Sequence, residues 1–131
     1  MRLTVEHVDG LRFIATTDNH SVVVDAAPED GGTGTAPTSP DLFAAAVAAC
    51  VCEFVTNSCR LHKFAFERIE ADVVCSELDH PRRLDAFDVQ IRIQPDPPDE
   101  VKRRLLGVAR HATLVNTLTR VPEVNIRFFG E

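Results

Sequence analysis

The sequence predicts a single α+β domain over residues 1–131, and three features lead to that class. Short segments with strand character open the chain, a long apolar helix occupies its middle, and two alternating strands followed by helices complete it. A chain of 131 residues forms one hydrophobic core rather than two. Hydrophobic residues make up 44% and charged residues 26%, which is typical of a globular protein and not of a disordered one.

Three short strands are expected at the start of the chain. Asp9-Gly10 lies between the first two and is a strong hairpin signal. A loop over residues 28–40 follows, because its glycines permit positive φ and its prolines remove hydrogen-bond donors. Only 27 residues precede this loop, too few for a separate domain. The three strands are expected over residues 3–8, 11–17 and 21–26.

A long helix is expected over residues 40–61. Ser39 would cap it, Pro40 suits the first helical position, and Asp41 lies at the positive end of the helix dipole. Residues 42–52 are apolar on every side, the pattern of a helix enclosed all round. In so small a domain a sheet covers one flank, so a second subunit is the simplest cover for the other. This run of eleven residues is about half of the roughly 20 that a membrane-spanning helix needs, so no membrane is expected.

Two longer strands with clear alternation are expected in the second half of the chain, paired antiparallel. Cys75 falls on the inward row of the first and is most simply a small core residue. A proline-rich stretch then stops the second strand and starts an amphipathic helix. The remaining ranges are strands 66–78 and 84–94, a helix beginning at 95–100, a break at 111–113, a short helix 114–119 and a last strand 124–129.

Charge and composition exclude several classes of protein. Lys and Arg total 14 against 20 Asp and Glu, a net charge of −6 that argues against a nucleic-acid partner. The first twenty residues contain no apolar segment of the kind found in secretory signals, so a cytoplasmic protein with reduced thiols is expected. No nucleotide-binding loop or hydrolase motif is present, so no cofactor is predicted.

The four cysteines do not form a metal site or a disulfide framework. Cys50 and Cys52 point roughly 160° apart on a helix, so they cannot hold one ion or pair with each other. Cys52 and Cys59 share a face but are separated by about 10 Å along the axis. The five histidines lie in different elements without paired spacing, and no metal is predicted. By residue chemistry alone, these helix cysteines are small hydrophobic core residues.

The segment from His20 to Val55 resembles the OsmC/Ohr family. Its members carry a strand that ends in Asp, a Gly/Pro-rich loop, and a Pro-x-Glu-Leu-Leu start to a central helix that contains a cysteine after small residues. The corresponding positions here are 21–25, Gly31-Gly32, Pro40-Asp41-Leu42-Phe43 and 45–50. The order of the later elements matches as well, so the resemblance covers essentially the whole chain, with the loop and helix as its specific part.

The resemblance implies an intertwined homodimer, with sheets from both subunits wrapped around two long apolar helices. Typical members reduce organic hydroperoxides with a pair of cysteines at the subunit interface. Cys50 would attack the peroxide as a thiolate and become a sulfenic acid, a second cysteine would close a disulfide with it, and an external dithiol would restore the enzyme.

The second cysteine is where this sequence departs from the family. The family's Cys-Pro-Val-x-x-Thr-Leu-like turn aligns with residues 112–118, which places Ala112 where cysteine is expected and His111 beside it. The usual two-cysteine cycle therefore cannot run. Cys52 and Cys59 face away from Cys50, and Cys75 would replace the partner only if its strand passes the helix at that point.

Other helpers to Cys50 have simpler interpretations beside the functional one. In the peroxidase branch of the family, an arginine near the first strands orients the thiolate. Arg12 lies in a suitable strand for this role, although a solvated arginine is the simpler interpretation. Asp41 matches the glutamate of the broader family pattern, whereas the peroxidase branch has its glutamate one residue earlier, at Pro40 here. Glu53, one turn after Cys50, would raise the pKa of that thiol, and His111 as imidazolium would lower it, unless it is an exposed helix-end residue.

Two hypotheses of function follow. In the first, Cys50 of an OsmC-like homodimer is oxidised by an organic hydroperoxide and reduced by an external thiol, with Arg12, Asp41 and His111 as candidate site residues. In the second, the dimer is not catalytic and binds a small apolar molecule at the subunit interface, with Cys50 as a packing residue. A purely structural or regulatory dimer is not distinguished from the second by the sequence.

Overall fold

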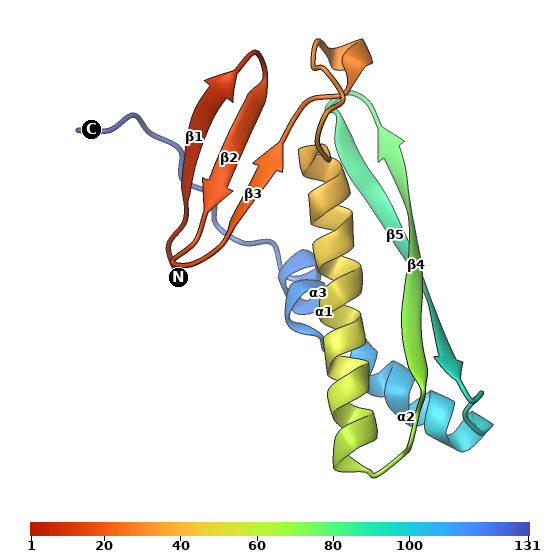
Figure 1. Cartoon of the computed structure of the whole chain (residues 1–131). Helices are drawn as coiled ribbons and strands as arrows, with labels where there is room; N and C mark the ends of the chain where they lie inside the picture. The colour runs from red at the N-terminus through yellow and green to blue at the C-terminus, as the bar shows by residue number, and fades with distance from the viewer.

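The computed structural model describes residues 1–131 and has the predicted α+β class (Figure 1). Its N-terminal strands form one antiparallel sheet in the order β1-β2-β3, and two longer strands form a separate antiparallel hairpin, β4-β5. The central helix α1 follows the first sheet, and two shorter helices follow the hairpin. The bounds are β1 (Thr4–Asp9), β2 (Arg12–Thr16), β3 (Ser21–Val24), α1 (Ser39–Leu61), β4 (Arg68–Leu78), β5 (Arg83–Gln94), α2 (Asp99–Ala109) and α3 (Thr113–Thr119), with a 3-10 turn at Pro28–Asp30.

Helix α1 begins one residue earlier than expected, because its cap is Thr38 and not Ser39. The Asp41 backbone N–H donates to Thr38 Oγ1 at 3.2 Å, and the Thr38 N–H donates to Asp41 Oδ2 at 3.1 Å. This reciprocal pair is a capping box, which satisfies two N–H groups at the helix start. By length and composition alone α1 is apolar enough to cross a membrane, a test that the core helix of a folded domain also passes.

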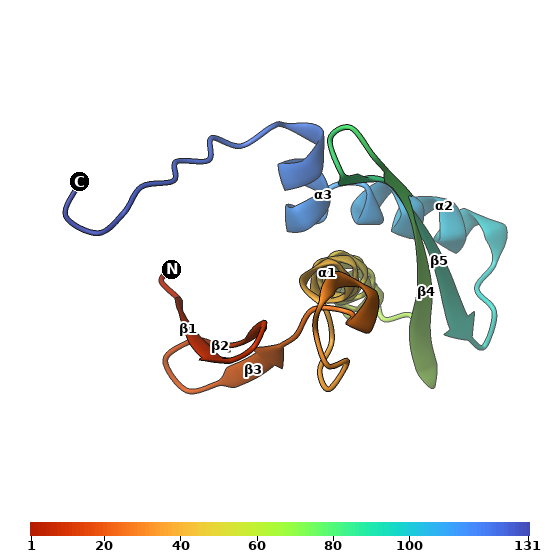
Figure 2. The ribbon, with the colours of Figure 1, turned by 90° about the horizontal axis from the view of Figure 1, so that it is seen from above.

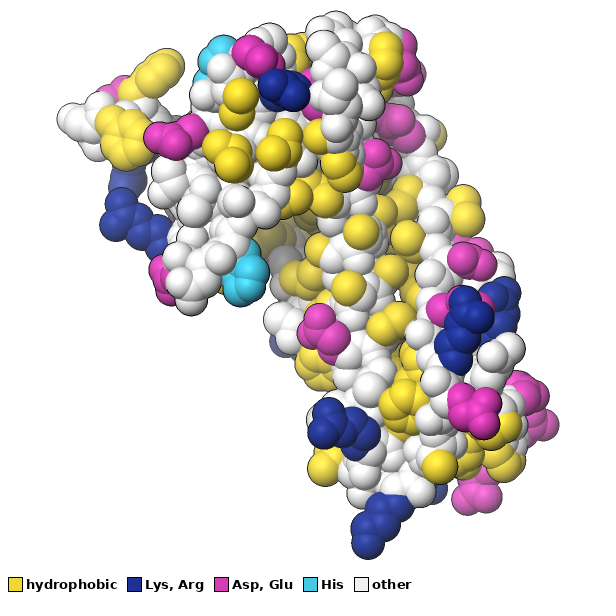
Figure 3. Space-filling view, in the orientation of Figure 1, with side chains coloured by type: hydrophobic (Ala, Val, Ile, Leu, Met, Phe, Trp, Pro, Cys, Tyr) yellow, Lys and Arg dark blue, Asp and Glu magenta, His cyan; other side chains and the backbone are white.

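The core lies where the hairpin and the shorter helices pack on α1. Alternation in β4 and β5 is confirmed, since their inward rows are at least partly buried while the residues between them are mostly exposed. The opposite side of α1 carries exposed Ala45, Ala46 and Ala49, and Figure 3 shows hydrophobic side chains gathered over this helix. The buried cluster comprises Cys50, Val51, Val55, Cys59, Ile93, Leu105, Ala109 and Ala112.

The N-terminal sheet stands apart from this core. Its strands pair with one another, while extensive packing on the helices or on the hairpin is absent (Figure 2). Apolar side chains are exposed on it, among them Val5, Phe13, Val22 and Val23. A sheet with uncovered apolar residues is not stable by itself in water, so within this chain the sheet lacks the layer that would cover it.

The prediction of a last strand over residues 124–129 is wrong for the isolated chain. Residues 121–131 form no strand, and Figure 2 shows them extending away from α3. Alternate residues are highly exposed: Val124 is 74%, Ile126 92% and Phe128 83% accessible. A strand forms only where a neighbour offers backbone N–H and C=O groups, and no strand of this chain does so here.

Candidate functional site

Cys50 lies in the middle of α1 and is 9% exposed. Its Sγ accepts a hydrogen bond from the Leu114 backbone N–H, at a donor–acceptor distance of 3.5 Å. Leu114 is the second residue of α3, where N–H groups have no partner within the helix. The Leu114 N–H therefore points at the sulfur and has it as its partner in place of a carbonyl oxygen of the helix.

The turn that begins α3 is the one in which the family's second cysteine is expected. Ala112 caps α3, is completely buried, and belongs to the same cluster as Cys50. The fold thus brings this position and the helix cysteine together, but the side chain at 112 is a methyl group. All four cysteines are free thiols in the structure.

The other cysteines lie elsewhere in the domain. Burial raises the pKa of Cys52, and the charge of the neighbouring Glu53 raises it further. Burial also raises the pKa of Cys59, which is 1% exposed. Cys75 pairs across the hairpin with Phe87, whose ring contacts a phenylalanine about two turns before Cys50 on α1. Cys52 and Cys59 are rotated about 160° and 180° round α1 from Cys50, and no disulfide joins any of the three to it.

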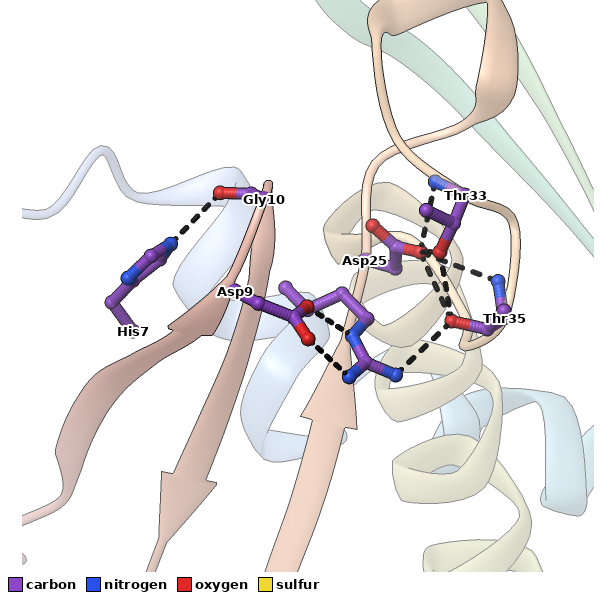
Figure 4. A network of polar contacts seen from close by, with 7 residues as sticks. His7, Asp9, Gly10, Asp25, Thr33 and Thr35 are labelled. Atoms are coloured by element: carbon purple, nitrogen blue, oxygen red, sulfur yellow. Dashed lines mark hydrogen bonds and ion pairs between the residues drawn. The ribbon is translucent and has the colours of Figure 1, made fainter.

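Arg12 joins the N-terminal sheet to the loop that follows it through hydrogen bonds to Asp9 and Thr35, both labelled in Figure 4. It lies on the middle strand, β2, and its Nε and Nη2 donate to the two carboxylate oxygens of Asp9 at 2.7 and 2.9 Å. Its Nη1 donates to Thr35 Oγ1 at 3.5 Å. Hydrogen bonding and charge hold the pKa of Asp9 below its ordinary value and raise that of Arg12. Within one chain, the Arg12 side chain is thus hydrogen-bonded to Asp9 and to Thr35 of the loop, and not to Cys50.

Asp25, at the end of β3, organises the loop that leads to α1. It is 2% exposed, and its Oδ2 accepts hydrogen bonds from the N–H and hydroxyl groups of both Thr33 and Thr35 (Figure 4). These bonds, led by the Thr33 hydroxyl, lower the pKa of Asp25 to about 2. Gly32 is required nearby, because a Cβ there would lie 1.8 Å from the Ala26 carbonyl oxygen. A strand that ends in Asp is one of the features by which the sequence resembles the OsmC/Ohr family. The hydrogen bonds by which Asp25 holds the following loop were not predicted.

Asp41 and His111 make no hydrogen bond with Cys50 either. Asp41 is committed to the capping box, nine residues before Cys50 and so about 13 Å away along the helix. His111 is exposed, and its carbonyl oxygen accepts a hydrogen bond from the Asn116 amide. The structure thus brings Cys50 close to position 112 and to Leu114, while Arg12, Asp41 and His111 make no hydrogen bond with it within one chain.

An apolar groove, here called the Phe43 groove, lies beside the turn that covers Cys50. It has a volume of about 380 Å³ and is lined by Ser39, Pro40, Phe43, Leu84, Phe87 and Leu118. The rings of Phe43 and Phe87 have centroids 5.8 Å apart. Phe43 lies two turns before Cys50 on the same face of α1, and Leu118 lies one turn after Leu114 on α3. The groove is chemically suited to a small apolar molecule.

Comparisons with known proteins agree with this geometry. The family model described as OsmC-like protein matches residues 32–127. Among solved structures, the chain is similar to an osmotic stress induced and detoxification response protein from Psychrobacter arcticus, with a TM-score of 0.82, 20% identity, and 88% of this chain and 85% of that chain covered. It is similar to the OsmC like protein from Mycoplasma pneumoniae, with a TM-score of 0.74, 18% identity, and coverage of 92% and 89%.

A third similar structure is the organic hydroperoxide resistance protein OhrB of Bacillus subtilis, with a TM-score of 0.64, 19% identity, and 92% of each chain covered. The search of curated proteins finds no match. The solved structures share the fold, and the family model spans most of the sequence with Cys50 and Ala112 inside it. The chain therefore belongs to the OsmC-like protein family.

Proposed function

We propose that this protein reduces organic hydroperoxides with Cys50 as its only peroxidatic thiol and an external thiol as reductant. The hydrogen bond from the Leu114 N–H to Cys50 Sγ carries the proposal, since it is the one polar contact that the surrounding core makes with this sulfur. Solved structures with the same fold include proteins described as organic hydroperoxide resistance proteins. The proposal places the reaction in the cytoplasm, where thiols are kept reduced.

The cycle requires two steps. The Cys50 thiolate attacks the terminal peroxide oxygen, the O–O bond breaks, and the alkoxide leaves as an alcohol after taking a proton, which leaves Cys50 as a sulfenic acid. One external thiol then displaces water to form a mixed disulfide, and a second thiol releases the external disulfide and the Cys50 thiolate. Ala112 offers no sulfur for an internal disulfide, so both reducing equivalents come from outside the protein.

The test is loss of cumene hydroperoxide in the presence of dithiothreitol. We expect the wild type to consume peroxide, Cys50→Ser to abolish consumption, and Cys52→Ser to leave it close to wild type. Mass spectrometry after peroxide treatment without thiol should find one added oxygen on Cys50. If the wild type matches Cys50→Ser and native Cys50 resists alkylation by iodoacetamide, the proposal is refuted.

We also propose that the protein works as a homodimer. The face of α1, the N-terminal sheet and residues 121–131 all expose apolar side chains that the chain itself does not cover. A second copy of the same chain is the simplest cover for all three. Light scattering after size exclusion should give twice the mass of the chain. The double variant Ile126→Asp and Phe128→Asp should lower the measured mass toward that of a single chain. A wild type that remains a monomer at micromolar concentration would contradict this proposal.

Arg12, Asp41 and His111 enter the proposed site only across such an interface, because none of them is hydrogen-bonded to Cys50 in its own chain. Arg12 lies on the sheet that its own chain leaves uncovered, and we propose that the active centre of a second subunit lies against this sheet. Arg12→Gln should then lower the rate of peroxide consumption, while the matched change Arg103→Gln on the exposed side of α2 should not.

The second candidate function is binding of a small apolar molecule without catalysis. The Phe43 groove favours it, because the groove is apolar and its Phe43 lies two turns before Cys50 on the same face of α1. If peroxide consumption is absent but cumyl alcohol still perturbs the Phe43 and Leu118 resonances in an NMR titration, this second function replaces the first.

A further inference from the structure

A second hollow, here called the α2 hollow, lies between α1, β5 and α2. It has a volume of about 300 Å³. Val55 of α1 lies at its base, Val89 and Ile91 of β5 form one wall, and Leu105 and Leu106 of α2 form another. The α2 hollow has no lining residue in common with the Phe43 groove, and Cys50 does not line it. It is therefore separate from the proposed peroxide site.

The size of the α2 hollow exceeds what ordinary packing leaves behind. Protein interiors contain few voids larger than a water molecule, and an apolar cavity of about 150 Å³ already binds benzene. A hollow of about 300 Å³ lies at the lower end of the volumes of small-molecule sites. Since its walls are aliphatic, its occupant needs an aliphatic body.

The mouth of the hollow supplies the polar part of the recognition. Arg92, Asp96 and Lys102 line it, so two cations stand beside one carboxylate. Arg92 is occupied by an ion pair with Glu70 on the neighbouring strand. Lys102 Nζ lies 2.9 Å from Asp96 Oδ1, and these side chains are 44% and 79% exposed. An exposed pair of this kind contributes little, so Lys102 can exchange Asp96 for the carboxylate of a ligand.

We infer that the α2 hollow binds a small aliphatic carboxylate, with its chain between β5 and α2 and its carboxylate on Lys102. A saturated chain of about eight to ten carbons matches the hollow in order of magnitude. With about ten non-hydrogen atoms and ordinary ligand efficiency, the dissociation constant is expected between about 0.1 and 10 mM.

The experiment titrates sodium octanoate into the full, isotope-labelled protein in its native oligomeric state and follows amide NMR shifts. We expect saturable shifts centred on Lys102, Leu105 and Leu106. Leu106→Glu, which places a charge on the apolar wall, should abolish them. The matched control is Leu78→Glu at the end of β4, where the leucine is 43% exposed against 47% for Leu106, and it should leave octanoate binding unchanged.

A second arm tests the carboxylate. Lys102→Gln should weaken octanoate binding about three- to tenfold, while binding of 1-octanol, which has the same chain and no charge, should stay the same. Leu106→Ala serves if Leu106→Glu fails to fold, and it should weaken both ligands. Absence of saturable binding, as would follow if a second copy of the chain fills the hollow, overturns the inference. Shifts that centre on Phe43 and vanish in Leu118→Glu overturn it as well.

Discussion

Ala112→Cys would restore a second thiol at the position that the family fills with cysteine. Cys50 and residue 112 lie in one buried cluster, and the Cys50 sulfur is 3.5 Å from the Leu114 nitrogen, two residues beyond position 112. We therefore expect the new thiol to form a disulfide with Cys50 on oxidation. In the peroxidase assay, this disulfide would replace the sulfenic acid as the resting oxidised form of the protein.

The size of the effect follows from the separation of the two residues along the chain. A disulfide between positions 50 and 112 closes a loop of about 60 residues, which constrains the unfolded chain by about 4 kcal/mol. For a domain of this length, that corresponds to a rise in Tm of about 10–15 °C from the reduced to the oxidised variant. In the reduced form, the added sulfur at a completely buried site should destabilise the variant by about 1–3 kcal/mol relative to wild type.

The assay compares Tm and thiol number before and after one equivalent of cumene hydroperoxide. The oxidised variant should lose two titratable thiols and two mass units, and its Tm should exceed that of its reduced form. The double variant Cys50→Ser with Ala112→Cys is the control and should form no internal disulfide. A folded Ala112→Cys protein that keeps both thiols free after oxidation would refute the placement of Ala112 beside Cys50.

Three further predictions concern stability. Four hydrogen bonds lower the pKa of Asp25 to about 2 from an ordinary 3.8, so the stability that it contributes is complete above about pH 4 and is lost as the pH falls toward 2. Asp25→Asn should abolish this pH-dependent contribution to stability, as measured by circular dichroism during acid unfolding between pH 5 and 2. Val55→Ala should lower the free energy of unfolding in urea by about 2–3 kcal/mol, against less than about 0.5 for the exposed Val74→Ala. Thr38→Ala should cost about 0.5–2 kcal/mol in the same assay, since the capping box with Asp41 is lost, and Thr38→Ser should retain most of it.

Local patterns predicted most of the elements because their causes are local. The inward rows of β4 and β5 alternate with a period of two, and each inward residue packs against a neighbour on the partner strand. The start of α1 was predicted to within one residue, because Thr38, Ser39 and Asp41 are all capping residues and only their geometry decides between them.

The candidate site depends on contacts between distant parts of the chain. The pattern of residues along the sequence contains no information about these contacts. Cys50 was identified through its resemblance to a family, since spacing alone gave no reason to separate it from Cys52 or Cys59. The donor to its sulfur, Leu114, lies 64 residues later and donates through its backbone, which leaves no trace in side-chain chemistry. Likewise, Arg12 was proposed for Cys50, but within one chain it is bound by Asp9, three residues away across the hairpin turn.

The error over the last strand and the isolation of Arg12 have one physical explanation. Val124, Ile126 and Phe128 alternate as a half-buried strand does, yet each is more than two-thirds exposed. Arg12 stands on a sheet whose apolar side chains are also partly uncovered, for example Val5 at 61% and Phe13 at 37%. A sequence carries the burial pattern of the assembly in which it functions, whereas one chain supplies only part of the neighbours. Where a pattern demands burial and the chain does not provide it, we propose that the missing surface belongs to a second copy of the chain, which is the self-complementary choice.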